Sequence, residues 1–134
     1  MHEILHPKGW KSAIGYSNGV AASGRMIFTG GMVGWNKDCI FEKDDFIGQA
    51  SQALSNIKAV LAEANAGPEH IVRLTWYITD KSEYLSNLKE LGSVYKKIIG
   101  RHYPAMALVQ VVALVEDAAK IEIEATAIIP EVMT

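Results

Sequence analysis

One stretch, residues 104–115, constrains the fold of this chain more than any other. It reads PAMALVQVVALV, and it is apolar at nearly every position. Because successive side chains of a β-strand point to opposite faces of the sheet, an extended segment of this composition must be covered on both faces. The sequence therefore predicts a strand that needs packing partners on each side.

The chain offers helices for only one of those two faces. Residues 44–66 carry an apolar stripe of helical period that stops at Gly67-Pro68, and a second helix is predicted from an Asp80 cap to Gly100. Leaving several Leu, Val and Met side chains of the other face in water would forgo roughly 1.5–3 kcal/mol each. We therefore expect the open face to be buried by self-association with copies of the same chain.

The remaining extended segments are shorter or alternate in polarity. Residues 19–30 read as a hairpin that turns at Ser23-Gly24, and residues 70–80 read as a strand. At the end of the 19–30 segment, Gly30, Gly31 and Gly34 predict a bulge or bend. An α+β fold with a mixed sheet and two helices on one face accounts for this element order.

The last strand, IEIEATAII, alternates over residues 121–127 and gives one apolar face and one face with two carboxylates. Glu122 and Glu124 share the second face. If that face lies in a subunit interface, a partly buried carboxylate becomes a candidate for acid–base chemistry. For Glu122 the functional and structural interpretations both stay open, whereas Glu124 is interpreted as structural or solvated.

Composition limits the class of protein. The 134 residues fit a single domain, 1–134, and the net charge of −2 with no basic run predicts no nucleic-acid partner. No apolar run is long enough to span a membrane, and the start has no signal-peptide organisation. The single Cys39 suits a reducing cytoplasm, and the four histidines lack metal-ligand spacing, so no metal site is predicted.

Several motifs together give the chain a family resemblance. The segments GYSNGV, FTGG, YITDKSEY, YPAMALVQV and KIEIEATA occur in the order and spacing of the reactive intermediate deaminase family, also called RidA/YjgF. The chain resembles this family over nearly its whole length. The resemblance implies a chorismate-mutase-like fold and a homotrimer, in which three sheets form a barrel with the helices outside. It also implies a small-molecule cleft between subunits and hydrolysis of imines or enamines without metal or cofactor.

The resemblance also assigns roles to individual residues. Glu122 matches the glutamate that positions and helps to activate the hydrolytic water. The cleft positions of the family match the following residues of this chain: Tyr16, Gly31, Tyr84, Met106 and Leu108.

Met106 is the departure that matters most. Deaminases of the family have Pro-Ala-Arg where this chain has Pro104-Ala105-Met106. The family arginine binds the substrate carboxylate through two parallel hydrogen bonds. A thioether cannot replace a permanently charged, bidentate guanidinium. Two hypotheses therefore stay open: a trimeric hydrolase whose imine substrate lacks the usual carboxylate, and a trimer that binds a small metabolite without turnover. Trp76 is interpreted as packing, and Trp35 as either packing or cleft lining.

Overall fold

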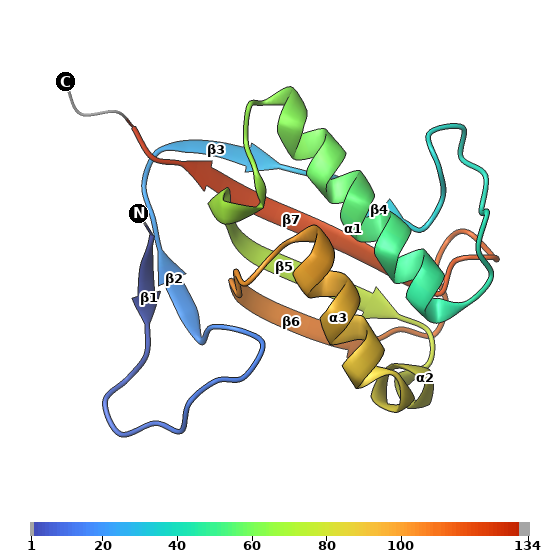
Figure 1. The fold of residues 1–134 in the computed structure, drawn as a ribbon, viewed down its shortest axis with the longest axis horizontal. Helices are drawn as coiled ribbons and strands as arrows, with labels where there is room; N and C mark the ends of the chain where they lie inside the picture. Colours follow the sequence, from blue (N-terminus) through green and yellow to red (C-terminus); the bar gives the residue numbers. More distant parts are fainter. Residues whose placement is uncertain (1, 132–134) are drawn as a thin grey trace.

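The fold is built on a five-stranded mixed sheet. The computed structural model describes residues 2–131, and its main sheet has the order β3-β7-β5-β6, with β4 also pairing with β7 (Figure 1). Strand β6 runs parallel to β5, while β7 runs antiparallel to β3, β4 and β5. The strands are β1 (Glu3–Leu5), β2 (Gly19–Ala21), β3 (Arg25–Phe28), β4 (Met32–Val33), β5 (Ile71–Ile78), β6 (Ala105–Gln110) and β7 (Ile121–Ile129).

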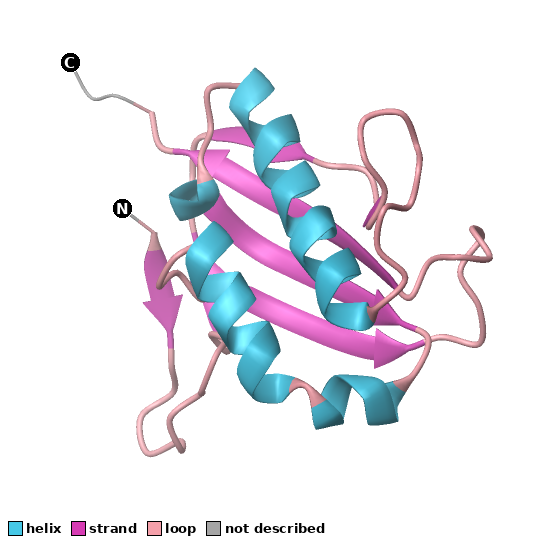
Figure 2. Cartoon of the chain, turned by 45° about the vertical axis from the view of Figure 1, so that its right-hand side comes forward, coloured by secondary structure: helices cyan, strands magenta, loops and turns pink. Residues whose placement is uncertain are grey.

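All helices lie on one face of this sheet, as Figure 2 shows. They are α1 (Phe46–Glu63), α2 (Lys81–Ser86) and α3 (Leu88–Ile98), and a short 3₁₀ turn, Pro68–His70, precedes β5. Asp45 caps α1 by accepting from the Gly48 amide at 3.0 Å, and Asp80 caps α2 by accepting from Glu83 at 3.2 Å. The expected α+β class with helices on one face is confirmed.

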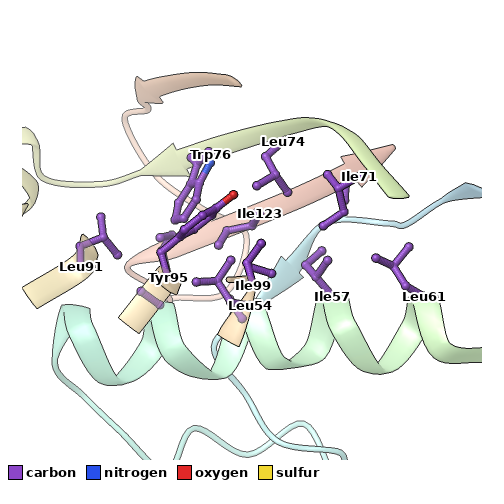
Figure 3. Close-up of a cluster of buried hydrophobic side chains, with 14 of the residues drawn as sticks. Leu54, Ile57, Leu61, Ile71, Leu74, Trp76, Leu91, Tyr95, Ile99 and Ile123 are labelled. Carbon is purple, nitrogen blue, oxygen red and sulfur yellow. The ribbon is translucent and has the colours of Figure 1, made fainter. Parts of the chain in front are cut away.

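The core fills the space between the helices and the sheet. Leu54, Ile57 and Leu61 of α1 are fully buried against Leu74 and Ile123 of the two central strands (Figure 3). The spacing of the three α1 residues is the helical period that the sequence displays, so the predicted stripe is the face that packs.

Three sequence-based boundaries differ from the structure. Residues 19–30 do not form a hairpin, because β2 pairs with β1 in a separate two-stranded sheet while β3 pairs with β7. The helix predicted from Asp80 breaks at Asn87, whose backbone leaves the helical region (φ −124°, ψ 23°), so that α2 and α3 are separate. The strand predicted over 104–115 ends at Gln110, and β6 is the edge strand of the sheet.

The glycine-rich segment after β3 forms the expected bulge. Phe28 pairs with Thr126 and Met32 pairs with Ile123, so the β3–β4 side carries one residue more than β7 over the same distance. An extra residue of this kind bends the strand and redirects the backbone next to it. Here the redirected backbone includes Gly31.

The sheet face opposite the helices has no cover within residues 2–131. Met26 and Phe28 of β3 are 56% and 65% exposed there, and Val109 of β6 is 45% exposed. Exposed apolar side chains on one continuous sheet face are typical of an interaction surface. In the part of the chain that the structure describes, no helix is long and apolar enough to cross a membrane.

Candidate functional site: an aromatic pocket and a glutamate face

A pocket of about 960 Å³ opens on the helix side of the sheet, beside the edge strand β6. Its floor comes from β5 and β6, one wall from α2 and α3, and the other from the loop before β2. The size suits a small organic ligand. The lining residues are Ala13, Ile14, Gly15, Tyr16, Trp76, Tyr84, Leu88, Leu91, Gly92, Tyr95, Tyr103, Met106 and Leu108.

The pairing of β5 with β6 puts Met106 and Leu108 into this pocket. Trp76 pairs with Leu108, and Leu74 pairs with Met106, in the parallel register of the two strands. Trp76 and Leu74 are buried under the helices, at 4% and 0% exposure. Because paired residues share a face, the side chains of Met106 and Leu108 also point to the helix side.

Backbone pairing to β6 fixes the loop that carries Tyr16. The Ser17 amide donates to the Pro104 carbonyl at 3.0 Å, Ser17 Oγ donates to the Tyr103 carbonyl, and Ser17 forms a parallel bridge with Ala105. Gly15 has a φ of 78°, a conformation that glycine adopts without strain. The turn at Gly15 and the pairing at Ser17 together bring Tyr16 to the mouth of the pocket.

Three aromatic rings form one side of the pocket. Tyr95 and Tyr103 stack with their ring centroids 5.5 Å apart and 16° between their planes, and the ring of Trp76 lies 6.2 Å from that of Tyr95. Figure 3 shows Trp76 and Tyr95 together between the sheet and the helices. This side offers a flat, polarizable surface to a ligand.

The polar groups of the pocket are few and uncharged. No lining residue is Asp, Glu, Lys, Arg or His. The Tyr95 hydroxyl donates to the His102 carbonyl, and burial, helped by the nearby Tyr103, raises the pKa of Tyr95 above its usual range. Trp76 Nε1 is buried, and within residues 2–131 it has no hydrogen-bond partner.

The two glutamates lie on the other face of the sheet. Tyr77 pairs with Glu122 of β7 and with Val109 of β6, so these three residues share the face opposite the helices. The Tyr77 hydroxyl donates to Glu124 Oε1 at 2.9 Å. This hydrogen bond, followed by desolvation and the charges of both glutamates, raises the pKa of the Tyr77 phenol above its usual value.

Glu122 has a different neighbour, the bulge glycine Gly31. A Cβ atom at residue 31 would collide with Glu122 Oε2, so the carboxylate occupies space that only glycine leaves free. Glu124 instead lines a smaller hollow of about 190 Å³ with Arg73, Thr75 and neighbouring residues. The two carboxylates, adjacent on one strand face, therefore have separate surroundings.

Within one protomer, the six residues predicted for the site fall into two groups. Tyr16, Tyr84, Met106 and Leu108 line the pocket on the helix side. Gly31 and Glu122 lie together away from that pocket, and Glu122 points to the other face of the sheet. A single chain thus separates the predicted water-activating carboxylate from the predicted binding pocket.

Sequence reasoning did not identify part of the pocket wall. Trp76 was interpreted as packing; it is buried, but it also lines the pocket, as do Tyr95 and Tyr103. The parallel pairing of β5 with β6 is the signal that would have found Trp76, because it sets Trp76 beside Leu108. Trp35 is not among the lining residues and packs on Phe41 with ring centroids 5.7 Å apart.

Comparison with solved structures identifies the class of fold. The chain resembles a protein of unknown function of the conserved Rid protein family, YyfB from Yersinia pestis, with a TM-score of 0.85, 31% identity, and coverage of 96% of this chain and 98% of that one. It also resembles Escherichia coli TdcF, solved with bound serine, with a TM-score of 0.66, 32% identity, and coverage of 94% and 98%. The architecture is therefore that of the Rid proteins.

Sequence comparisons lead to the same family. The family model described as Endoribonuclease L-PSP matches residues 8–129. A RutC family protein of Pasteurella multocida is 29% identical over 96% of this chain and 98% of its own length. TdcF of Escherichia coli, assigned by name to the reactive intermediate deaminases, is 33% identical over 96% and 98%. The chain belongs to the RidA/YjgF family.

Proposed function

We propose that this protein hydrolyses a small imine or enamine that has no carboxylate, in a cleft formed between subunits of a homotrimer. The observation that carries the proposal is the pocket around Met106, whose lining contains no charged side chain. A carboxylate would enter such a pocket without a cation to pair with and would lose its hydration. A neutral substrate with an apolar or aromatic body has no such cost.

The trimer is part of the proposal because it supplies what one protomer lacks. The pocket and Glu122 belong to opposite sides of one sheet, and the face that carries Glu122 is open and partly apolar. If that face packs beside the β6 edge of another copy, the carboxylate of one protomer joins the pocket of its neighbour. An edge strand presents unpaired backbone groups that can pair with another chain.

Glu122 is then the group that moves protons. As the oxygen of a water molecule bonds to the imine carbon, the Glu122 carboxylate accepts a proton from that water and passes it to the imine nitrogen, which gives a carbinolamine. Glu122 then takes the hydroxyl proton of the carbinolamine and passes it to the amino nitrogen, the C=O bond forms as the C–N bond breaks, and ammonia leaves with Glu122 again ionised. Water and imine are consumed one to one, and no metal or organic cofactor is required by this balance.

Turnover of two imines tests the proposal. A flavin amine oxidase acting on benzylamine supplies a neutral aromatic imine, and an amino acid oxidase supplies carboxylate-bearing imines. Hydrolysis is followed by competition with semicarbazide, which traps the remaining imine. We expect the protein to accelerate loss of the neutral imine more than loss of the carboxylate-bearing ones. The opposite preference would contradict the proposal.

A second function is favoured by the separation of Glu122 from the pocket. If the subunits do not bring the two together, the same pocket binds a small metabolite without turnover. Saturable ligand binding with no acceleration of either imine would support this alternative. The Endoribonuclease description of the family model does not lead us to propose RNA cleavage, because the net charge is −2 and the pocket lining has no cation for phosphate.

Light scattering on the purified protein tests the assembly. We expect the mass of a trimer, and we expect Phe28→Asp to produce smaller species because it places a charge on the open sheet face, where Phe28 is 65% exposed. Val60→Asp is the matched control, since Val60 is 38% exposed but belongs to α1 in the helix layer. A monomeric wild-type protein at micromolar concentration would contradict the trimer.

A further inference from the structure

We propose that the indole N–H of Trp76 is a ligand-binding donor, and that the pocket takes a flat, uncharged aromatic compound with a carbonyl or imine acceptor. The inference rests on the proposed function for the ligand's location, but it does not require turnover. It starts from one anomaly. Trp76 is only 4% exposed and lines the pocket, yet its Nε1 has no hydrogen-bond partner among residues 2–131.

An unpaired buried N–H is unusual and costly. The large majority of buried side-chain polar atoms in proteins are hydrogen-bonded, because an unpaired one forfeits its bond to water. A phenylalanine would offer a similar aromatic surface without carrying this group. The other buried polar group of the aromatic side, the Tyr95 hydroxyl, is already paired with the His102 carbonyl. The Trp76 N–H is therefore the buried donor still free on that side.

The walls indicate the shape of the ligand. Tyr95 and Tyr103 are stacked, and Trp76 lies beside them, so the aromatic side presents ring surfaces. Gly15 of the loop and Gly92 of α3 also line the pocket, and a Cβ atom at either would meet nothing within 4 Å. Space beside flat rings favours a planar ligand, which gains dispersion contacts by stacking.

The chemistry of the lining indicates the functional group of the ligand. Indole N–H only donates, so the ligand must bring a lone pair. The absence of cations in the lining disfavours a carboxylate, and the absence of anions disfavours an ammonium group. A neutral sp² acceptor meets all three conditions. Because Nε1 is covered in the free protein, its bond to the ligand forms only after neighbouring side chains shift.

Acetophenone and ethylbenzene are suitable unreactive probes, because both have one ring and only the first has a carbonyl acceptor. Their dissociation constants are measured by titration on the wild-type protein, with benzoate as the charged comparison. The indole N–H signals in ¹⁵N–¹H spectra report the donor directly. We expect saturable binding of acetophenone, weaker binding of benzoate, and a downfield shift of the Trp76 signal with acetophenone that ethylbenzene does not produce.

Variants separate the hydrogen bond from the packing of the ring. Trp76→Phe should reduce the acetophenone-to-ethylbenzene affinity ratio about five-fold, the value of one neutral hydrogen bond. Replacement of Trp76 by β-(3-benzothienyl)alanine keeps the bicyclic shape without the N–H and should give the same reduction. This second variant provides the test if Trp76→Phe does not fold. Trp35→Phe is the control, since Trp35 packs on Phe41 outside the pocket lining, and it should leave the ratio unchanged.

Two results would overturn the inference. One is no saturable binding of either probe. The other is an affinity ratio that the loss of the N–H leaves unchanged, together with a wild-type Trp76 signal that acetophenone does not shift. Failure of the proposed hydrolysis gives a different result. The wild-type protein then accelerates the loss of neither imine, while acetophenone binding and the Trp76 shift remain. The two proposals are therefore tested separately.

Discussion

Met106 and Glu122 lie on opposite faces of the same sheet. The register that places Met106 opposite Leu74 on the helix side places Glu122 opposite Tyr77 on the open side. A change at one of these positions therefore does not act on the other through direct contact within a protomer. Direct contact between the two side chains would require a second copy of the chain.

The first prediction is that Met106→Arg introduces activity on carboxylate-bearing imines. The arginine side chain would enter a pocket with no other charge, where a charge-assisted hydrogen bond to a carboxylate is worth about 1.5–3 kcal/mol. We expect kcat/KM for 2-aminoacrylate to rise about ten- to one-hundred-fold over wild type. Met106→Gln, which is polar but neutral, is the control. An equal rise with glutamine would show that the charge is not the cause.

The second prediction separates the two glutamates. Glu122→Gln should lower turnover of the neutral imine by about 10²- to 10⁴-fold, the usual contribution of a general base. Glu124→Gln should retain most of the activity, because Glu124 is held by the Tyr77 hydroxyl at 2.9 Å and lines a separate hollow. The rates are compared after light scattering has verified that both variants have the mass of the wild type. A larger loss at Glu124 would refute this assignment.

The third prediction concerns Gly31, because its missing side chain leaves room for the Glu122 carboxylate. Gly31→Ala would push that carboxylate aside, and we expect turnover to fall at least about ten-fold while the thermal midpoint changes little, since the end of a glutamate side chain is flexible. Gly30→Ala is the matched control. A Cβ atom there would make only an ordinary contact with Met32, at 3.8 Å. Equal losses in both variants would point to the bulge backbone instead.

The fourth prediction is an alkaline loss of stability that depends on Tyr95. Burial raises the pKa of its phenol above the ordinary value of 10.0, so the folded protein keeps a proton that the unfolded chain releases. The free energy of unfolding is therefore unaffected by this group below about pH 10 and falls above it, by up to about 1.4 kcal/mol per pH unit. Urea titrations of wild type and Tyr95→Phe between pH 8 and 11 measure the difference. Parallel curves would exclude this contribution.

The sequence by itself determined the elements that repeat a clear pattern. The period of Leu54, Ile57 and Leu61 specified the buried face of α1, and the alternation of Glu122 with Ile123 specified the two faces of β7. These patterns are reliable because burial of an apolar stripe is a local property of one element. The family was also predicted from the sequence, because short motifs identify it.

Tertiary structure alone decided which elements are neighbours. Nothing local indicates that β2 pairs with β1 and not with β3, or that the helix after Asp80 breaks at Asn87, because strand pairing and helix packing depend on the whole chain. The same holds for the site. Trp76 enters the pocket through its parallel pairing with Leu108, and Glu122 is carried away from it by the parity of β7. Residue identity supplies the chemistry, but register and face decide which groups can meet, and that is fixed only when the sheet forms.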